Sequence, residues 1–407
     1  METLRFLMIS THYPPLHLGG DAVFVSYLSD ELVRLGHEVH VVSNPGVYRA
    51  LRGSRKEAMK IENPSGVSLH DYDPRLARTS TVLSLSLNLS RKALREVDRL
   101  TKDIHPDVVH WHNTKGFIGR PFVTSGALSL CTAHDYFMVC PRSNLTRPDQ
   151  SFCKKPKDCL LCTLRWKSPP QLWRAGGKRV IHLSSDIRIL CPSQFLCRRL
   201  EEDGIKPYSV LRNFVPRPAN GQAANHYGDS LVYLGILEQH KGPETLLEAF
   251  AKSKGQHGFK LKLIGEGSLK SHLGARAKEL GVEDRVEIPG FLPRSEVESI
   301  LSEAASLVVP SEWPENCPLS VLEALSLGVP VLGSDQGGLP EIISIANQRL
   351  FKSGNRDDLA GSLKDIWADR KGLEALREKA RIAYESNFSP EVHMSGYFRI
   401  INEAWPA

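Results

Sequence analysis

Short apolar runs alternate with helical stretches along the whole chain, and this alternation constrains the fold more than any other feature. Residues 4–10 form the first apolar run, residues 22–35 have a helical pattern, and residues 38–43 form a second run after Gly36. Strands that alternate with helices build parallel sheets, because each helix returns the chain to the end of the sheet where the next strand begins. Later strands of this half are expected at 107–111, 127–132 and 187–191, with a helix at 193–203. The sequence thus predicts an α/β protein.

The length of 407 residues is typical of two domains. Residues 213–229 combine chain breakers with little apolar content, so they predict a linker. Beyond it we expect strands at 230–235, 259–264, 286–289, 307–310 and 329–333. Helices are expected at 243–254 and 268–280, two more within 356–384, and a last one at 390–405. The first domain then covers residues 1–212, with an insert at about 140–170, and the second covers 230–386. Two doubly wound domains that face one another place ligands in the cleft at the carboxyl ends of their strands.

Composition and the first residues argue against a membrane-spanning protein and against a secreted one. Hydrophobic residues make up 41% and charged residues 24% of the chain, which is ordinary for a soluble globular protein. No uncharged apolar run reaches the roughly 18 residues that a membrane span needs. Residues 1–10 lack the basic start and long apolar run of a secretory signal and instead predict a first strand. The expected location is the cytoplasm.

Charge is unevenly distributed. Residues 1–200 contain 29 Lys and Arg against 17 Asp and Glu, a net charge of +12, and the remaining residues contain 23 against 29, a net charge of −6. The basic clusters are Arg49, Arg52, Arg55, Lys56, Lys60 and Arg91, Lys92, Arg95, Arg99. They lack interleaved aromatic residues, which argues against nucleic acid as a partner. Two interpretations stay open: a surface for an anionic membrane, such as the inner face of the plasma membrane, or for a lipid-diphosphate acceptor, and a solvated surface without a partner.

Two glutamates, Glu315 and Glu323, stand eight residues apart across a predicted junction between a loop and a helix. The loop follows the strand at 307–310, and Asn316 is a suitable N-cap for a helix over 318–327. Free backbone N–H groups at a helix start can hold an anion. An anion site flanked by two carboxylates suits a sugar nucleotide, because the amides can bind phosphate while the acids bind sugar and ribose hydroxyls.

The stretch from Ser311 to Leu325 resembles the E-x7-E motif of retaining glycosyltransferases of the GT-B fold, family 4. Further matches follow in that family's order along the chain. They are Tyr13-Pro-Pro-Leu-His-Leu-Gly-Gly, Ala133-His-Asp, Tyr233-Leu-Gly-Ile-Leu-Glu-Gln-His-Lys-Gly, Leu263-Ile-Gly-Glu-Gly, Ile288-Pro-Gly-Phe-Leu-Pro and Gly337-Gly-Leu-Pro-Glu. The resemblance covers nearly the whole chain and implies the GT-B fold, with a final helix at 387–407 that crosses back to the first domain.

The resemblance also implies roles for individual residues. His134, at the end of a strand, would face the donor sugar and support the transition state, and Lys241 would neutralise the diphosphate as it leaves. Glu315 and residues 316–319 would hold the sugar, and Glu323 the ribose. The other expected binding residues are Gly19, Gly20, Gly235, Gly265, Asn316, Cys317, Pro318 and Leu319. The implied reaction is attack on the same face of the sugar with the leaving phosphate as base, and it needs no cofactor.

One residue departs from the family's pattern. Ile236 stands directly after Gly235, where the family usually has Arg, so one phosphate-binding cation is missing. Arg212 replaces a residue that is commonly Pro, and it either supplies that charge or lies on the surface. The function implied is transfer of a sugar from a nucleoside diphosphate-sugar to a hydroxyl of a glycan or lipid-linked glycan. The alternatives are a sugar-nucleotide-binding protein with weak or no transfer and a GT-B nucleotide-sugar epimerase.

Four of the eight cysteines fall within the basic, Pro-rich insert. Cys140, Cys153, Cys159 and Cys162 have the spacing C-x12-C-x5-C-x2-C. A C-x2-C pair supplies two thiolates from one turn, which is typical of a structural zinc site. The other two cysteines lack such a pair, so zinc and plain reduced thiols both stay open.

Overall fold

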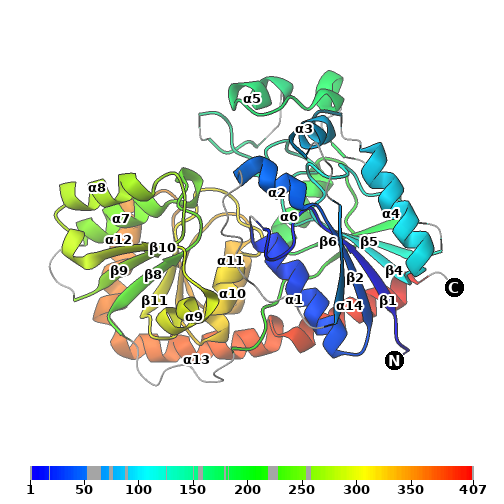
Figure 1. The fold of residues 1–407 in the computed structure, drawn as a ribbon. Coiled ribbons are helices and arrows are strands. Elements are labelled where there is room, and N and C mark those ends of the chain that lie inside the picture. Colours follow the sequence, from blue (N-terminus) through cyan, green and yellow to red (C-terminus); the bar gives the residue numbers. More distant parts are fainter. Residues whose placement is uncertain are drawn as a thin grey trace. The chain divides into compact units, whose positions relative to one another are not determined.

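The computed structural model describes residues 2–17, 19–52, 66–72, 77–87, 90–124, 126–149, 151–154, 159–177, 180–181, 183–218, 228–253 and 258–405. The chain divides into two compact units: residues 1–211 with 394–407, and residues 212–393. Both sheets are parallel throughout and are surrounded by helices, which confirms the predicted GT-B class of fold (Figure 1). Part of the predicted linker, residues 219–227, lies outside the described residues, as do Arg55, Lys56 and Lys60 of the first basic cluster.

The first unit contains a seven-stranded sheet with the strand order β3-β2-β1-β4-β5-β6-β7. Its strands are β1 Arg5–Ile9, β2 Glu38–Ser43, β3 Val67–Asp71, β4 Val108–Trp111, β5 Leu128–Thr132, β6 Ile187–Cys191 and β7 Ser209–Val210. Its helices are α1 Gly20–Arg34, α2 Pro45–Arg52, α3 Ala77–Leu87, α4 Arg91–Ile104, α5 Cys159–Arg165, η1 Leu172–Gly177 and α6 Gln194–Glu202. The order runs outward in both directions from β1 and β4, so the loops after these two strands diverge at the switch point where ligands bind in such sheets.

The second unit contains a six-stranded sheet with the order β10-β9-β8-β11-β12-β13. Its strands are β8 Ser230–Leu234, β9 Lys260–Ile264, β10 Val286–Gly290, β11 Ser306–Val309, β12 Val331–Ser334 and β13 Arg349–Phe351. Its helices are η2 Gln239–Lys241, α7 Pro243–Lys252, α8 Lys270–Glu279, η3 Glu283–Arg285, α9 Arg294–Ser302, α10 Leu319–Ser326, α11 Leu339–Ile345, α12 Arg356–Ala368 and α13 Arg370–Asn387. The switch point lies between β8 and β11.

The last helix, α14 Pro390–Ala404, packs its C-terminal part on the sheet of the first unit (Figure 1). Tyr397 is fully buried, its ring stacks on Phe6 of β1, and its hydroxyl lies 2.8 Å from Nδ1 of His110 in β4. Nε2 of His110 lies 2.8 Å from the hydroxyl of Thr132 in β5. The helix is thus fixed to three neighbouring strands by aromatic packing and by hydrogen bonds that satisfy buried polar groups.

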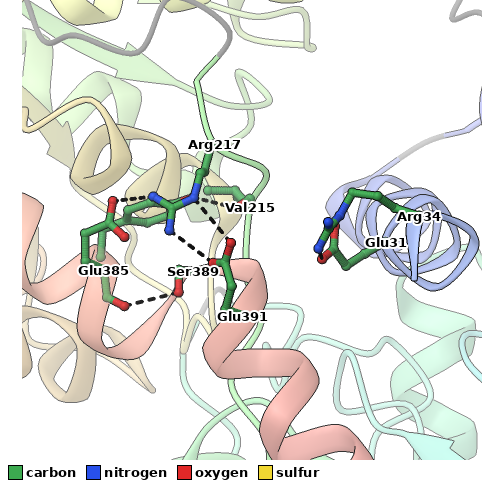
Figure 2. Close-up of polar contacts among 8 residues, drawn as sticks. Glu31, Arg34, Val215, Arg217, Glu385, Ser389 and Glu391 are labelled. Carbon is green, nitrogen blue, oxygen red and sulfur yellow. Dashed lines mark hydrogen bonds and ion pairs between the residues drawn. The ribbon is translucent and has the colours of Figure 1, made fainter. Parts of the chain in front are cut away.

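The segment after residue 211 is held to the junction of α13 and α14 inside the second unit. Arg217 forms ion pairs with Glu385 at 2.6 Å and with Glu391 at 3.1 Å, as Figure 2 shows. The Tyr384 hydroxyl donates to the carbonyl of Val215 at 2.9 Å. The exposed ion pairs contribute little stability alone, but the buried Tyr384 hydroxyl fixes the path of the backbone.

Candidate active site

Glu315 and Lys241 form a largely buried ion pair after the central strands of the second unit. Glu315 lies in the loop after β11, Lys241 ends η2 after β8, and Nζ of Lys241 is 2.6 Å from Oε1 of Glu315. The Ser311 hydroxyl donates to the same oxygen at 2.6 Å. Burial alone would raise the pKa of Glu315, but Lys241 and Ser311 outweigh burial and lower it. The carboxylate is therefore ionised at neutral pH.

Two predicted glycines bring backbone segments of this site into contact. Gly265, after β9, has a φ of +143°, and a Cβ at this position would collide with the carbonyl oxygen of Gly235, after β8. The Gly235 loop is held further by Tyr233, whose hydroxyl donates to the Ile236 carbonyl at 2.6 Å. Gly337, after β12, packs in the same close manner against the backbone of Glu315. Only glycine permits these approaches, which bring the loops after β8, β9, β11 and β12 into close contact.

The prediction that Asn316 caps the following helix is wrong. Helix α10 begins at Leu319, and its N-cap is Pro318, which makes no side-chain cap hydrogen bond. Proline is suited to a helix start because its fixed φ fits there and its missing N–H would have no partner. Asn316 and Cys317 instead lie in the loop before α10, both buried. The backbone N–H groups at the start of α10 have no carbonyl partner one turn back within the helix, although that of Val321 donates to the Pro318 carbonyl at 3.1 Å.

Arg212 lies near this loop. Its guanidinium is within electrostatic range of the Cys317 thiol, and the neighbouring Asn213 donates its amide to the Cys317 carbonyl at 3.2 Å. Burial raises the pKa of Cys317 to about 12, so the thiol is uncharged at neutral pH. The structure thus brings Arg212 and Cys317 together in the second unit.

Glu323 lies in the second turn of α10, in a different environment from Glu315. Burial raises its pKa, partly offset by the cation of Arg294 on α9. Neither Lys241 nor Glu315 is among the groups that shift it, whereas Glu298 is. The two glutamates therefore occupy separate microenvironments along one loop and helix.

The predicted glycines of the first unit start α1. Gly19 is the N-cap and Gly20 the first helical residue. Asp21, the next residue, accepts a hydrogen bond from the amide of Asn113 at 2.9 Å. Asn113 follows β4, so the turn after β1 and the loop after β4 meet at the switch point of this sheet.

His134 follows β5 and lies beside a second histidine. Its Nε2 is 2.9 Å from Nδ1 of His112, and the two rings stack with centroids 5.2 Å apart. Burial lowers the pKa of His134 to about 4, against an opposing effect of Asp21, so the ring is neutral at neutral pH. His112, Asn113, His134 and Asp135 line a small pocket that is partly open to solvent. The sequence did not predict the contact with His112, because it joins residues of neighbouring strands.

The four cysteines of the insert lie on three segments of the first unit. Cys140 precedes the turn at Ser143, Cys153 follows an isolated bridge between Thr146 and Phe152, and Cys159 and Cys162 lie on α5. As they are placed, no group of three or more His, Cys, Asp or Glu side chains within the described ranges could hold a metal ion. The zinc site therefore stays a prediction at this point.

Two family models match the chain in sequence. The model "Glycosyltransferase Family 4" matches residues 18–217, and "Glycosyl transferases group 1" matches residues 221–383. A glycogen synthase of Mycobacterium tuberculosis is 25% identical over 95% of this chain and 91% of its own length. An amylovoran biosynthesis glycosyltransferase of Erwinia amylovora is 34% identical over 42% of this chain and 43% of its own.

Solved structures agree in fold. The sucrose-phosphate synthase of Thermosynechococcus elongatus has a TM-score of 0.69 and 17% identity, covering 98% of this chain and all of that one. A glycosyltransferase of lipopolysaccharide biosynthesis, WaaG, has a TM-score of 0.67 and 16% identity, covering 98% and 99%. In the described part of the chain, no helix has the length and apolar character needed to cross a bilayer. The chain belongs to the GT-B glycosyltransferases of family 4 and is a glycosyltransferase.

Proposed function

We propose that the chain transfers a sugar, with retention of anomeric configuration, from a nucleoside diphosphate-sugar to a hydroxyl of a glycan or lipid-linked glycan. The observation that best supports this is the pair of Glu315 and Lys241 at the switch point of the second sheet, 2.6 Å apart. A carboxylate for sugar hydroxyls and a cation for phosphate stand side by side there. This is the arrangement that a donor with a sugar joined to a diphosphate requires.

Each site residue has a role in this proposal. Lys241 and the amides at the start of α10 stabilise the negative charge that develops on the leaving diphosphate. Glu315 binds sugar hydroxyls, and Glu323 binds the ribose. The bond between the anomeric carbon and the phosphate oxygen breaks, and the acceptor oxygen forms the new glycosidic bond on the same face. Because the acceptor oxygen attacks the anomeric carbon directly, no side chain serves as nucleophile. The acceptor's proton passes to the leaving phosphate, so no side chain serves as base. His134 contacts the sugar as a neutral ring.

The donor class has support from structural neighbours. The Anabaena protein HepE, solved in complex with UDP-glucose, has a TM-score of 0.65 and 15% identity to this chain, covering 98% of it and all of that chain. UDP-glucose is therefore the first donor to test. The curated relatives include proteins of colanic acid, amylovoran and lipopolysaccharide synthesis, which favours a surface polysaccharide or its lipid-linked precursor as the acceptor.

The ion pairs on α4 weaken the argument, drawn from the sequence, that the basic surface binds an anionic membrane. On α4, Arg99 forms ion pairs with Glu96 at 2.6 Å and Asp103 at 2.7 Å, and Lys102 pairs with Asp98 at 2.8 Å. Part of the cationic charge is therefore neutralised within the helix. Arg91 and Lys92, in its first turn, remain our candidates for contact with anionic lipid or acceptor diphosphate.

The deciding experiment is a thermal-shift screen of the purified chain against nucleoside diphosphate-sugars, followed by product analysis with the donor that stabilises most. A ligand at a hundredfold excess over its Kd stabilises by about 2.7 kcal/mol. Transfer, or slow donor hydrolysis without acceptor, supports the proposal. Glu315→Gln should strongly lower either activity, and Glu374→Gln, on the exposed face of α13, is the matched control. Binding without turnover would favour a binding protein, and an epimerised donor would favour an epimerase.

A further inference from the structure

Trp313 stands in the loop after β11, two residues before Glu315, and the ammonium of Lys241 lies over its ring. The Lys241 Nζ is 4.6 Å from the centroid of the Trp313 ring and 2.6 Å from Oε1 of Glu315. A cation over the face of an aromatic ring is attracted by the negative charge of that face, and tryptophan gives the strongest attraction. Lys241 therefore has two attractive partners, a carboxylate and an aromatic ring, that come from the same loop.

The segment that carries Trp313 is anchored to η2 and to the first turn of α7. The N–H of Glu312 donates to the His240 carbonyl at 3.0 Å, and the Glu312 carboxylate accepts a hydrogen bond from the Thr245 hydroxyl at 2.5 Å. The His240 and Trp313 rings meet edge to face, with centroids 5.3 Å apart and an interplanar angle of 83°. Pro314 follows and disfavours the helical conformation of the Trp313 backbone. These contacts hold the Trp313 ring in one place.

The position of the Lys241 ammonium matters because a lysine side chain is long and flexible. Lys241 is 20% exposed, so burial alone does not fix its end. In the proposed function Lys241 binds the diphosphate, and Ile236 adds no second cation to the loop after β8. A contact that orders the ammonium before the donor binds reduces the conformational entropy that is lost on binding.

We propose that Trp313 is a positioning residue, whose ring holds the Lys241 ammonium beside Glu315 before the donor binds. This role rests on the proposed function, in which Lys241 binds the donor diphosphate. Trp313 acts through Lys241 in this role and needs no contact with the reacting atoms. Its removal should therefore affect the reaction only while Lys241 is present.

The first test observes the contact by NMR, in the full chain labelled with ¹³C-lysine and without any donor. The ε-methylene protons of Lys241 should resonate upfield of those of exposed lysines, because they lie near the face of an aromatic ring. The signal is assigned by its absence in Lys241→Met, which separates it from that of Lys115, whose Nζ lies 5.4 Å from the Phe137 ring centroid. It should stay upfield in Trp313→Phe and lose its upfield shift in Trp313→Leu. A wild-type Lys241 signal at the position of exposed lysines would overturn the proposal.

The second test measures kcat/KM with the donor that the thermal-shift screen identifies. Trp313→Leu should lower kcat/KM about tenfold, whereas Trp313→Phe keeps an aromatic ring and should stay within about threefold of the wild type. In the Lys241→Met background, Trp313→Leu should cause no further loss, because the ring then has no ammonium to hold. Trp367→Leu, on α12 of the same unit, is the matched control for loss of an indole ring and should retain the wild-type kcat/KM.

The two tests separate this proposal from the proposed function. A wild type that turns over no donor would contradict the function, and the NMR signal would still decide whether Trp313 holds Lys241. If the wild type is active but Trp313→Leu lowers kcat/KM equally with and without Lys241, Trp313 does not act through Lys241. Either that result or an unchanged kcat/KM in Trp313→Leu would overturn the proposal.

Discussion

Removing one charge of the Lys241–Glu315 pair should cost far more stability than removing both. Their side chains are 20% and 8% exposed and 2.6 Å apart. Lys241→Met leaves the Glu315 carboxylate buried without its cation, and breaking such pairs costs about 3–5 kcal/mol. The Ser311 hydroxyl still donates to Glu315, so we expect about 3 kcal/mol. The double variant Lys241→Met/Glu315→Gln leaves no buried charge and should lie within about 1.5 kcal/mol of the wild type.

The effect of Lys241→Met should also depend on pH. In the wild type the pKa of Glu315 is lowered, so its stabilising contribution is present above its unfolded pKa and is lost as pH falls through the folded value. Without Lys241, burial becomes dominant and raises the folded pKa above the unfolded one. Ionisation of the buried carboxyl then destabilises the protein, so the free energy of unfolding falls as pH rises. The variant should therefore be destabilised more at about pH 8 than at about pH 5.

Differential scanning calorimetry measures this, because it can separate the unfolding of two units. A loss of about 3 kcal/mol should lower the Tm of the second unit by about 6–12 °C. Lys364→Met, on the exposed face of α12, is the control and should change the free energy of unfolding by less than about 0.5 kcal/mol. The reasoning is refuted if Lys241→Met behaves like this control, or if the double variant loses the sum of the single losses.

Three further predictions concern the site, the last helix and the surface. Glu323→Ala should raise the KM for the donor about tenfold with little change in kcat, whereas Glu315→Gln should lower kcat more than it raises KM, measured by steady-state kinetics. His110→Phe removes a buried hydrogen bond to the Tyr397 hydroxyl and should cost about 1–3 kcal/mol in denaturant unfolding. Sedimentation with anionic liposomes should fall as salt rises and should weaken in Lys92→Glu, and equal binding to neutral vesicles would contradict this.

Strands with strong apolar runs could be predicted from the sequence, and elements without them could not. The predicted runs at 38–43 and 187–191 coincide with β2 and β6. Strand β3 was missed because it lies at the sheet edge and all five of its residues are partly or largely exposed. Helix α4 was recognised only as a basic cluster, because its buried face consists of three residues among many charges. Elements with few buried apolar residues, such as β3 and α4, could therefore not be recognised from the sequence.

In the candidate site, the resemblance named Lys241 and Glu315 but could not show that they pair. The two residues are 74 positions apart and meet because β8 and β11 are neighbours in the sheet. The contact of His112 with His134 across β4 and β5 escaped prediction for the same reason. The prediction that Asn316 is the N-cap of α10 rested on its residue type alone and was wrong, because Pro318 takes the N-cap position. Residue types were predictable, and contacts between strands were not.

The pairing of Lys241 with Glu315 links recognition of phosphate to recognition of sugar. Ile236 supplies no cation to the loop after β8, and in the proposed function Lys241 serves the diphosphate while it neutralises Glu315. When a phosphate binds Lys241 and separates it from Glu315, the buried Glu315 carboxylate loses its charged hydrogen-bond donor. Sugar hydroxyls can then donate hydrogen bonds to it instead. A nucleoside diphosphate without a sugar provides none. We therefore expect isothermal titration to give a Kd for the diphosphate about tenfold weaker than for the matching diphosphate-sugar, with the difference lost in Glu315→Gln. Equal affinities in the wild type would show that Lys241 binds phosphate without releasing Glu315.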